Sequence, residues 1–477
     1  MRDMSWWKRT KLDAAFQNGR AASFLFALAS LMLILTFLVV IIPRAKATSL
    51  QTPLQEEALL IDDERYSAED ISFYVYQVFR SWYAYCEQTY GDGAFVRQLF
   101  DDDALLDAAI QQAVETKLWY EDAQKNGFDT ADAEKLAQQF IEDINVLAQK
   151  AGVSYEQYLT HIFGDGFTSS CFERQIRRSA TASLWRGAYM QSFQMTLESC
   201  EAYYATHRDS FTYVDYDQLF FYVQENGMSD AAACVAAEQA YAAIQAGEDM
   251  ASVSARFPEA SLSHNENTIR NISPVFDWLF STDRNPGDTT LIRAENTAYY
   301  ILSFLSAYRN EYETLNIVYA QIPISNDAEQ LASHSALRPD EGRDIANNVL
   351  ELWRQRGSAE SALLELLEAL PSPIHSKTYS RLQKGKLDQG ADDWLFDSQR
   401  EAGDYTILEN SSAITIIYIS GRDLPCWQAQ VEQAASEEQC GQYLEDMKAS
   451  CSVMCLSGLN HVIDYLNDTY LAHKQVQ

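Results

Sequence analysis

The chain has 477 residues, of which 47% are apolar and 12% aromatic, which is enough apolar material for several packed cores and excludes wholesale disorder. Its formal net charge is −32. Proteins that bind nucleic acids or anionic lipid surfaces present clusters of Lys and Arg, so this charge argues against both kinds of partner.

An uncharged apolar segment stands near the N-terminus. Residues 21–43, AASFLFALASLMLILTFLVVIIP, are long enough to cross a hydrocarbon core of about 30 Å as a helix. Residues 1–46 hold 7 Lys and Arg but 2 Asp and Glu, and such a basic flank stays in the cytoplasm. We therefore expect a cytoplasmic stub (1–20), a transmembrane helix (21–43) and a single-pass protein of the cell membrane with its bulk extracytoplasmic. The alternative is a signal peptide cleaved after Ala47.

The rest of the chain is acidic. Residues 47–477 hold 29 basic and 66 acidic side chains, a formal charge of −37, as expected for a soluble exported part. Residues 44–66 mix charge, Pro and short apolar pieces, which predicts a linker.

From Ser67 to residue 210 the apolar residues recur at helical spacing, so this block is predicted to be all-helical. A helix over 103–126 is expected to stop at Gly127. Ser154 with Gln157 three residues later predicts a capping box that opens another helix. The block contains no metal-ligand spacing and no glycine-rich phosphate loop.

At residue 211 the pattern changes and is then repeated. FTYVDYDQLFFYV predicts a strand, followed by an Ala-rich helix, a polar loop, a short helix and the strand AYYILSFL. The same order recurs from LNIVYAQIPI to AITIIYIS, so we expect a duplicated domain over 211–311 and 312–429. The tail 430–477 is predicted to be helical.

One phrase marks the repeat. DWLFSTDRNPGDTT (277–290) and DWLFDSQREAGDYT (393–406) match at eight of fourteen positions. We interpret the phrase as packing, because it contains no nucleophile with a base beside it. In this interpretation the aromatic residues face the sheet, each Gly supplies a positive φ and each Asp caps the turn backbone. The structural repeat comprises Trp278, Phe280, Arg284, Gly287 and Asp288, and Trp394, Phe396, Arg400, Gly403 and Asp404.

No cofactor or metal is expected. The seven histidines are scattered and the eight cysteines lack a paired zinc spacing. Outside the cytosol an even number of cysteines permits disulfides, and we expect the four between Cys426 and Cys455 to pair before the others.

The order of elements resembles a known family. The strand, the helix ending in Gly247-Glu248-Asp249-Met250 and the later Gly-Asp turn before a strand are similar to a parvulin-type (PpiC-type) peptidyl-prolyl isomerase domain. AQKNGFDTADAE (123–134), GVSYEQYLTHIFGDGFT (152–168) and EAYYATHRDSF (201–211) resemble the N-terminal chaperone domain of the SurA/PrsA group of extracytoplasmic foldases. The fold class implied is α+β multidomain: a transmembrane helix, an all-helical SurA-N-like domain, two parvulin-like α+β domains and a helical C-terminal tail.

The resemblance also implies where a catalytic site would lie. The family carries one histidine on its first strand and one on its late strand. Those slots fall on Phe220 and Tyr300 in the first unit, and on Gln321 and Thr415 in the second, so both units are degenerate. Phe276 corresponds to the family's groove phenylalanine, where the second unit has Asp392, and His264 is expected in a solvated loop.

Three functions follow as hypotheses. The first is a membrane-anchored extracytoplasmic chaperone of the isomerase family that binds newly exported, unfolded polypeptides, with isomerase activity weak or lost. The second is an active prolyl isomerase that assists the folding of secreted proteins. The third is a structural envelope protein that binds one folded partner.

Overall fold

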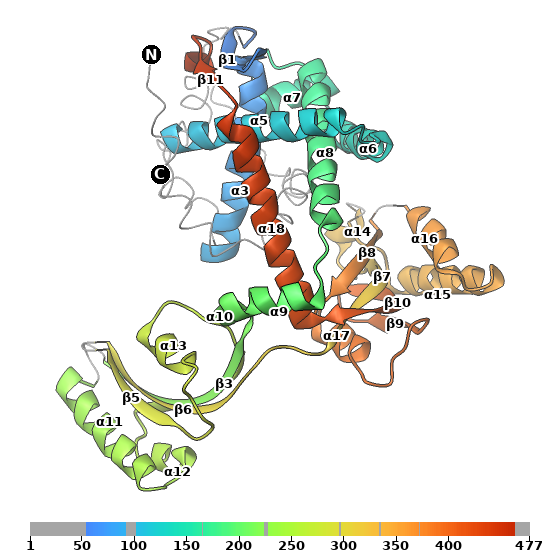
Figure 1. Cartoon of the computed structure of the whole chain (residues 1–477). Helices are drawn as coiled ribbons and strands as arrows, with labels where there is room; N and C mark the ends of the chain where they lie inside the picture. The colour runs from blue at the N-terminus through green and yellow to red at the C-terminus, as the bar shows by residue number, and fades with distance from the viewer. Residues whose placement is uncertain are drawn as a thin grey trace. The chain divides into compact units, whose positions relative to one another are not determined.

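The computed structural model describes residues 54–91, 102–164, 166–223, 228–294, 297–332, 335–371 and 373–462 (Figure 1). The chain divides into two compact bodies. The first body comprises Met1–Gln194 with Ala434–Gln477, and the second comprises Met195–Gln433.

The first body is built on long helices that share one apolar core. Its elements are β1 (Glu57–Ile61), β2 (Glu64–Ser67), α3 (Ala68–Tyr90), α5 (Asp102–Lys125), α6 (Ala131–Lys150), α7 (Tyr155–Phe163), α8 (Ser169–Ser192), the part of α18 (Cys426–Ala449) from Ala434 on, and β11 (Val453–Cys455). The predicted capping box at the start of α7 is confirmed: the Ser154 side chain accepts from the Gln157 backbone N–H, and the Gln157 side chain accepts from the Ser154 N–H. Gly127 follows α5 with φ at 65°.

The described elements from Ala68 to Phe211 are all helices, but the predictions on either side of this block are wrong. β1 and β2 lie in the predicted linker 44–66, with β2 ending at Ser67, and β11 lies in the predicted helical tail 430–477. In the first body they form a three-stranded sheet of order β11-β1-β2. Asp62 and Asp63 turn the chain between β1 and β2, with Asp62 at a φ of 55°. β11 comes from the C-terminal tail and pairs with β1 through Leu60 and Met454. Partners almost 400 residues apart leave no local pattern in the sequence, so periodicity alone could not find this sheet.

The transmembrane part of the predicted fold class is also corrected. Within the described ranges, no helix is both long enough and apolar enough to span a membrane. The segment 21–43 lies outside those ranges. Over the part of the chain that the structure describes, the fold class is a mixed α/β multidomain arrangement with three sheets.

The second body holds two four-stranded antiparallel sheets with the same strand order, β4-β3-β6-β5 and β8-β7-β10-β9. We call them the first and second sheet units. The helices α9 (Leu197–Thr206) and α10 (Arg208–Phe211) precede the first unit. The first unit contains β3 (Tyr213–Tyr222), α11 (Asp230–Gln245), α12 (Met250–Ser254), β4 (Ala260–Thr268), α13 (Pro274–Leu279), β5 (Thr289–Ala294) and β6 (Ala298–Tyr308).

The second sheet unit repeats this series. It contains β7 (Glu313–Pro323), α14 (Ala328–Ala332), α15 (Pro339–Gln355), α16 (Glu360–Glu368), β8 (His375–Leu382), α17 (Gln389–Leu395), β9 (Tyr405–Glu409) and β10 (Ala413–Pro425). In the first unit α11 and α12 cover one face of the sheet and α13 the other (Figure 1). In the second unit α15 and α16 cover one face and α17 the other. Each sheet therefore has two separate cores.

The expectation that the C-terminal cysteines pair is wrong, because no disulfide joins any of the eight cysteines, all of which lie in the described ranges. Cys426 and Cys440 are buried in α18, where they pack as small apolar side chains. An even count of cysteines permits disulfides but does not bring any two sulfurs together.

Candidate functional site

The repeated phrase has nearly the same geometry in both sheet units. Gly287 has φ at 92° and donates its N–H to the carbonyl of Phe304 at 2.8 Å. Gly403 has φ at 95° and donates to the carbonyl of Ile419, also at 2.8 Å. These are backbone conformations that glycine adopts without the steric cost of a Cβ. The turn of each unit is therefore hydrogen-bonded in the same way to the neighbouring strand, β6 in the first unit and β10 in the second.

The charged residues of the phrase stabilise the same turn. Asp288 Oδ2 accepts from the backbone N–H of Asn285 at 2.9 Å, and Asp404 Oδ2 accepts from Glu401 at 3.1 Å. The guanidinium of Arg284 lies 4.9 Å from the ring centroid of Trp278, and that of Arg400 lies 5.2 Å from Trp394. Each of these side chains has a packing or capping contact, so the phrase supports the scaffold rather than chemistry.

The structure brings together the residues at the two predicted histidine slots. Phe220 of β3 lies directly opposite Tyr300 of β6, and their rings stack with centroids 6.2 Å apart. Gln321 of β7 lies directly opposite Thr415 of β10. Neither of these two pairs contains a histidine. In the second pair, Thr415 is buried and Gln321 is exposed.

In the first unit these residues belong to a half-exposed aromatic face on the α13 side of the sheet. We define the aromatic face as Phe220, Tyr222, Phe276, Ile292 and Tyr300. Ile292 lies opposite Tyr300 on β5, and Phe276 comes from α13. Tyr222 is two residues beyond Phe220 on the same side of β3 and is 53% exposed. The face is apolar and has no charged member.

Two strongly exposed isoleucines lie on the chain that leads from β4 to α13. Ile269 is 62% exposed and Ile272 is 88% exposed. Arg270 between them points to the protein, where it pairs with Asp209 and Asp277 at 2.7 Å each. Because Arg270 is held from both sides, the flanking isoleucines are presented to solvent rather than folded inward. Sequence reasoning missed this feature, since two isoleucines in a polar stretch give no periodic signal.

The corresponding row of the second unit is polar. His375 of β8 pairs with Gln321, which pairs with Thr415, which in turn pairs with Leu408 of β9. Asp392 stands on α17 where a groove phenylalanine was sought, and its carboxylate accepts from the backbone N–H of Gly385. This face therefore lacks the apolar lining of the first unit.

His264 lies in a strand rather than in the predicted loop. It belongs to β4, where its Nδ1 is 2.6 Å from Asp217 and its Nε2 is 3.1 Å from Glu266. The hydrogen bonds to Asp217 and then Glu266 raise the pKa of His264 above its usual value. A histidine held by two carboxylates is occupied by structural contacts and faces away from the aromatic row. The alternation of the polar stretch SLSHNENT was too weak to predict this edge strand.

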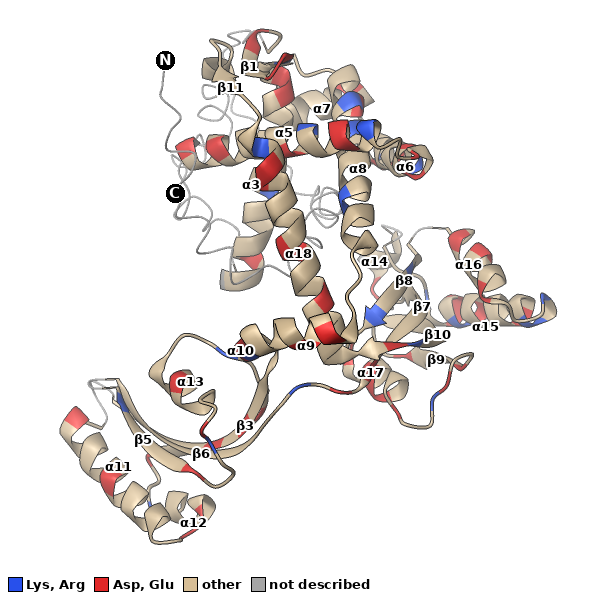
Figure 2. Cartoon of the chain, viewed as in Figure 1, with Lys and Arg blue, Asp and Glu red and all other residues tan. Residues whose placement is uncertain are grey.

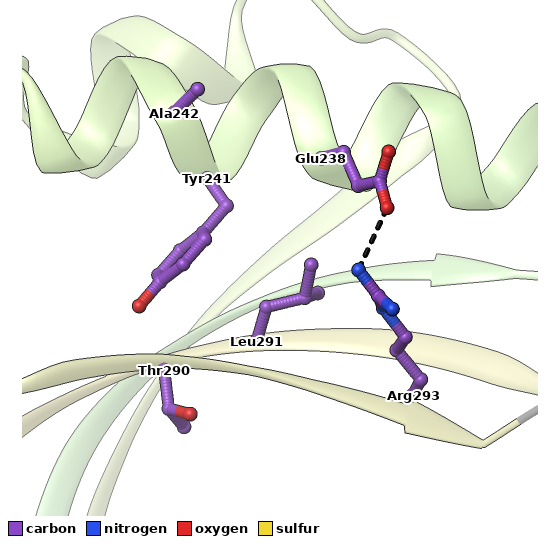
Figure 3. A pocket seen from close by; sticks show the side chains of 6 residues that line it. All are labelled: Glu238, Tyr241, Ala242, Thr290, Leu291 and Arg293. Atoms are coloured by element: carbon purple, nitrogen blue, oxygen red, sulfur yellow. Dashed lines mark hydrogen bonds and ion pairs between the residues drawn. The ribbon is translucent and has the colours of Figure 1, made fainter.

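A pocket of about 540 Å³ opens between α11 and β5 (Figure 3). It is lined by Glu238, Tyr241, Ala242, Thr290, Leu291 and Arg293. Arg293 reaches from the strand to Glu238 on the helix at 2.7 Å. Within the described part of the chain, no group of three or more His, Cys, Asp or Glu side chains is arranged to hold a metal ion.

Comparisons with known proteins give little further information. No model of a known protein family matches the chain, and no curated protein matches it. A similar solved structure comes from Campylobacter jejuni and is described as that of two structurally related SurA-like chaperones, the virulence factor PEB4 and the periplasmic protein Cj1289. The two chains are 12% identical, the match covers 68% of this chain and 98% of that chain, and the TM-score is 0.18. A likeness of this size carries no argument about function.

Proposed function

We propose that the chain is a SurA-like extracytoplasmic chaperone that binds newly exported, unfolded polypeptides. The observation that supports this most directly is the exposed pair Ile269 and Ile272 next to α13, which carries Phe276 of the aromatic face. Exposed apolar surface is costly in water unless a partner covers it. An unfolded chain offers the apolar side chains that such a surface takes.

The charge of the molecule fits this role. Acidic side chains are spread over both bodies (Figure 2), and the chain carries a formal charge of −32. A large net charge keeps a complex with an exposed apolar client in solution through mutual repulsion. The acidic composition of residues 47–477 also supports a location outside the cytoplasm.

Isomerase activity is proposed to be weak or absent. Rotation about an X–Pro bond meets a barrier of about 18–20 kcal/mol, and a catalyst must bind the twisted bond better than the planar one. The Phe220–Tyr300 row offers stacking surface but no imidazole. The Gln321–Thr415 row offers one exposed amide with the exposed His375 beside it on β8, and neither predicted slot of this unit holds a histidine. An apolar face can still desolvate the bond, which is why some activity is compatible with this site.

The chaperone proposal is tested by light scattering of a chemically denatured client diluted into buffer with the purified full chain. We expect aggregation to be suppressed, and the double substitution Ile269→Ser with Ile272→Ser to remove at least half of the suppression. The control is Val146→Ser with Val153→Ser, two exposed β-branched residues of the first body that are 45% and 40% exposed. No suppression by the wild type, or equal loss in both double variants, would contradict the proposal.

The same preparation decides between the alternatives. In a proline tetrapeptide assay we expect a rate close to that of buffer, and a strong acceleration that is lost in Phe276→Ala would instead indicate an active isomerase. In a pull-down we expect many unfolded clients. Capture of one stoichiometric folded partner would favour a structural envelope protein.

A further inference from the structure

The first sheet has a free edge strand, β5, with a pocket beside it. The strand order β4-β3-β6-β5 places β5 at the edge, with β6 as its single strand partner among the described residues. The pocket of about 540 Å³ follows this edge, between β5 and α11 (Figure 3). The pocket is wide open to solvent, so a large side chain can reach it from the free edge.

The register of the ladder shows which backbone groups of β5 face outward. The Phe304 N–H donates to the Asp288 carbonyl at 2.9 Å, so alternate residues from Asp288 onward bond to β6. The groups of Thr289, Leu291 and Arg293 then point to the free edge. In agreement, the Thr289 carbonyl accepts from the Tyr241 hydroxyl of α11 at 3.2 Å. Leu291 and Arg293 are left with edge donors and acceptors beside the pocket.

The second sheet unit has the same edge, but there side chains of α15 contact the edge strand β9. The repeat places Tyr405 of β9 where the first unit has Thr289, one residue after Asp404 and Asp288. The Tyr405 ring contacts Trp353 of α15 at 5.1 Å, and its hydroxyl accepts from Arg354 at 2.9 Å. Arg343 of α15 binds Glu409 of β9 through two hydrogen bonds of 2.8 Å. In the first unit a threonine replaces the tyrosine and a single exposed pair, Arg293 with Glu238, replaces the bidentate one.

The charge beside the groove selects the occupant. Residues 228–255, which include α11, contain four acidic and no basic side chains, and α11 is marked by Asp and Glu alone in Figure 2. Glu238 is 50% exposed, pairs with Arg293 at 2.7 Å and accepts from the Cys234 thiol at 3.9 Å. A lysine or arginine of a partner can therefore bind Glu238 at the rim while an apolar side chain enters the pocket between Tyr241 and Leu291.

We propose that an extended segment of an unfolded polypeptide adds to the β5 edge as a fifth strand, with an apolar side chain in the pocket and a neighbouring Lys or Arg at Glu238. Strand addition satisfies the edge groups of Leu291 and Arg293 with backbone hydrogen bonds, while the pocket and Glu238 provide selectivity. This binding mode rests on the proposed chaperone function but uses a surface separate from the aromatic face.

The test is binding of a fluorescein-labelled peptide of alternating Leu and Lys to the full chain, followed by fluorescence anisotropy. We expect Ala242→Trp, which fills the pocket from an exposed helix position, to weaken binding at least tenfold. Ala232→Trp, an exposed alanine of α11 that does not line the pocket, should leave it within twofold. Both variants are first compared with the wild type by circular dichroism and thermal unfolding.

Two further measurements isolate the backbone and the charge. N-methylation of alternate peptide nitrogens should abolish binding, because it removes the donors needed for strand pairing. Glu238→Gln should weaken the Lys peptide at least threefold and leave a Leu and Ser peptide unchanged. Unchanged binding in Ala242→Trp or with the N-methylated peptide would overturn the proposal, as would a dimer of this chain that Ala242→Trp dissolves.

Light scattering with the same variants separates the two proposals. If Ala242→Trp loses the peptide but still suppresses client aggregation, the groove is a separate site and both proposals stand. If the wild type binds the peptide through the groove but suppresses no aggregation, the groove stands and the chaperone function fails.

Discussion

The two sheet units share a topology and a turn but differ in what they present to solvent. The first has an aromatic face on its α13 side and an open groove beside β5. The second has the polar row His375–Gln321–Thr415, and Tyr405 of its edge strand packs against Trp353 of α15. Both units keep the scaffold through the glycine N–H hydrogen bonds to β6 or β10 and the Arg–Trp contacts, which do not involve the residues of the aromatic face or the groove. A duplicated domain can therefore keep one copy for binding while the other becomes a packed support.

The largest expected loss of stability follows from substitution of Trp353, which packs against the edge strand of the second unit. Trp353 is 1% exposed, contacts Tyr405 and Tyr418, and donates its indole N–H to the Ala359 carbonyl at 2.8 Å. We expect Trp353→Ala to lower the free energy of unfolding by about 3–5 kcal/mol, since it leaves a large cavity and an unsatisfied carbonyl. Urea unfolding followed by circular dichroism measures this loss.

The matched change in the first unit has a different origin. There α11 packs through fully buried alanines, including Ala237. Ala237→Leu should cost about 1–3 kcal/mol by overpacking. A loss below about 1 kcal/mol in Trp353→Ala would contradict the view that the second unit is the packed one.

The next effect tests whether the turn is equivalent in both units. Gly287→Ala and Gly403→Ala should each cost about 1–2 kcal/mol, because both residues have positive φ while an added Cβ meets no atom within 4 Å. The cost is therefore one of backbone conformation alone. Gly441→Ala in α18, where φ is not positive, should instead be neutral or stabilising by up to about 1 kcal/mol. If the losses of unfolding free energy in Gly287→Ala and Gly403→Ala differed by more than a factor of two, the two turns would not be equivalent.

The sequence predicted the parts of this comparison that depend on local pattern. The repeated phrase aligned the two units, and that alignment identified Phe220 with Tyr300 and Gln321 with Thr415, pairs that lie opposite one another in the sheets. The β1–β11 pairing, the position of His264 and the absence of disulfides among the cysteines depend on contacts between distant residues, which no spacing encodes. The groove was also missed, because it lies between α11 and β5, which are about fifty residues apart in the sequence.

A smaller effect is expected from the cation–π contacts of the phrase. Arg284→Met and Arg400→Met should each cost about 0.5–1 kcal/mol, as the guanidinium above Trp278 or Trp394 is lost while the apolar stem is kept. Tryptophan fluorescence and urea unfolding report the change in each unit. Arg284→Lys and Arg400→Lys keep the charge without the planar stacking group, so a full recovery in the lysine variants would show that charge alone matters.

The smallest expected effects on stability come from pH. The contribution of His264 in the first unit should fall as pH rises, and that of Glu409 in the second unit should fall as pH drops. In the first unit, Asp217 and Glu266 raise the pKa of His264, so its contribution is complete below the ordinary value of 6.5 and is lost as pH rises through the higher pKa of the folded state. In the second unit, hydrogen bonds from Arg343 lower the pKa of Glu409, so its contribution is present above the ordinary value of 4.5 and is lost as pH falls through the lower folded value.

The measurement is the difference in Tm between wild type and each of His264→Gln and Glu409→Gln across about pH 4 to 9. Wild type minus His264→Gln should decline only above about pH 6.5, whereas wild type minus Glu409→Gln should decline only below about pH 4.5. Both groups are exposed, so the shifts are small and should shrink further in high salt. A decline of both differences on the same side of neutrality would show that one of these pairs does not form in solution. His264 is on β4, an edge strand of the first sheet, and contacts β3, whereas Glu409 is on β9, the opposite edge strand of the second sheet, and binds α15. The experiment therefore measures the contribution of one edge strand in each unit separately.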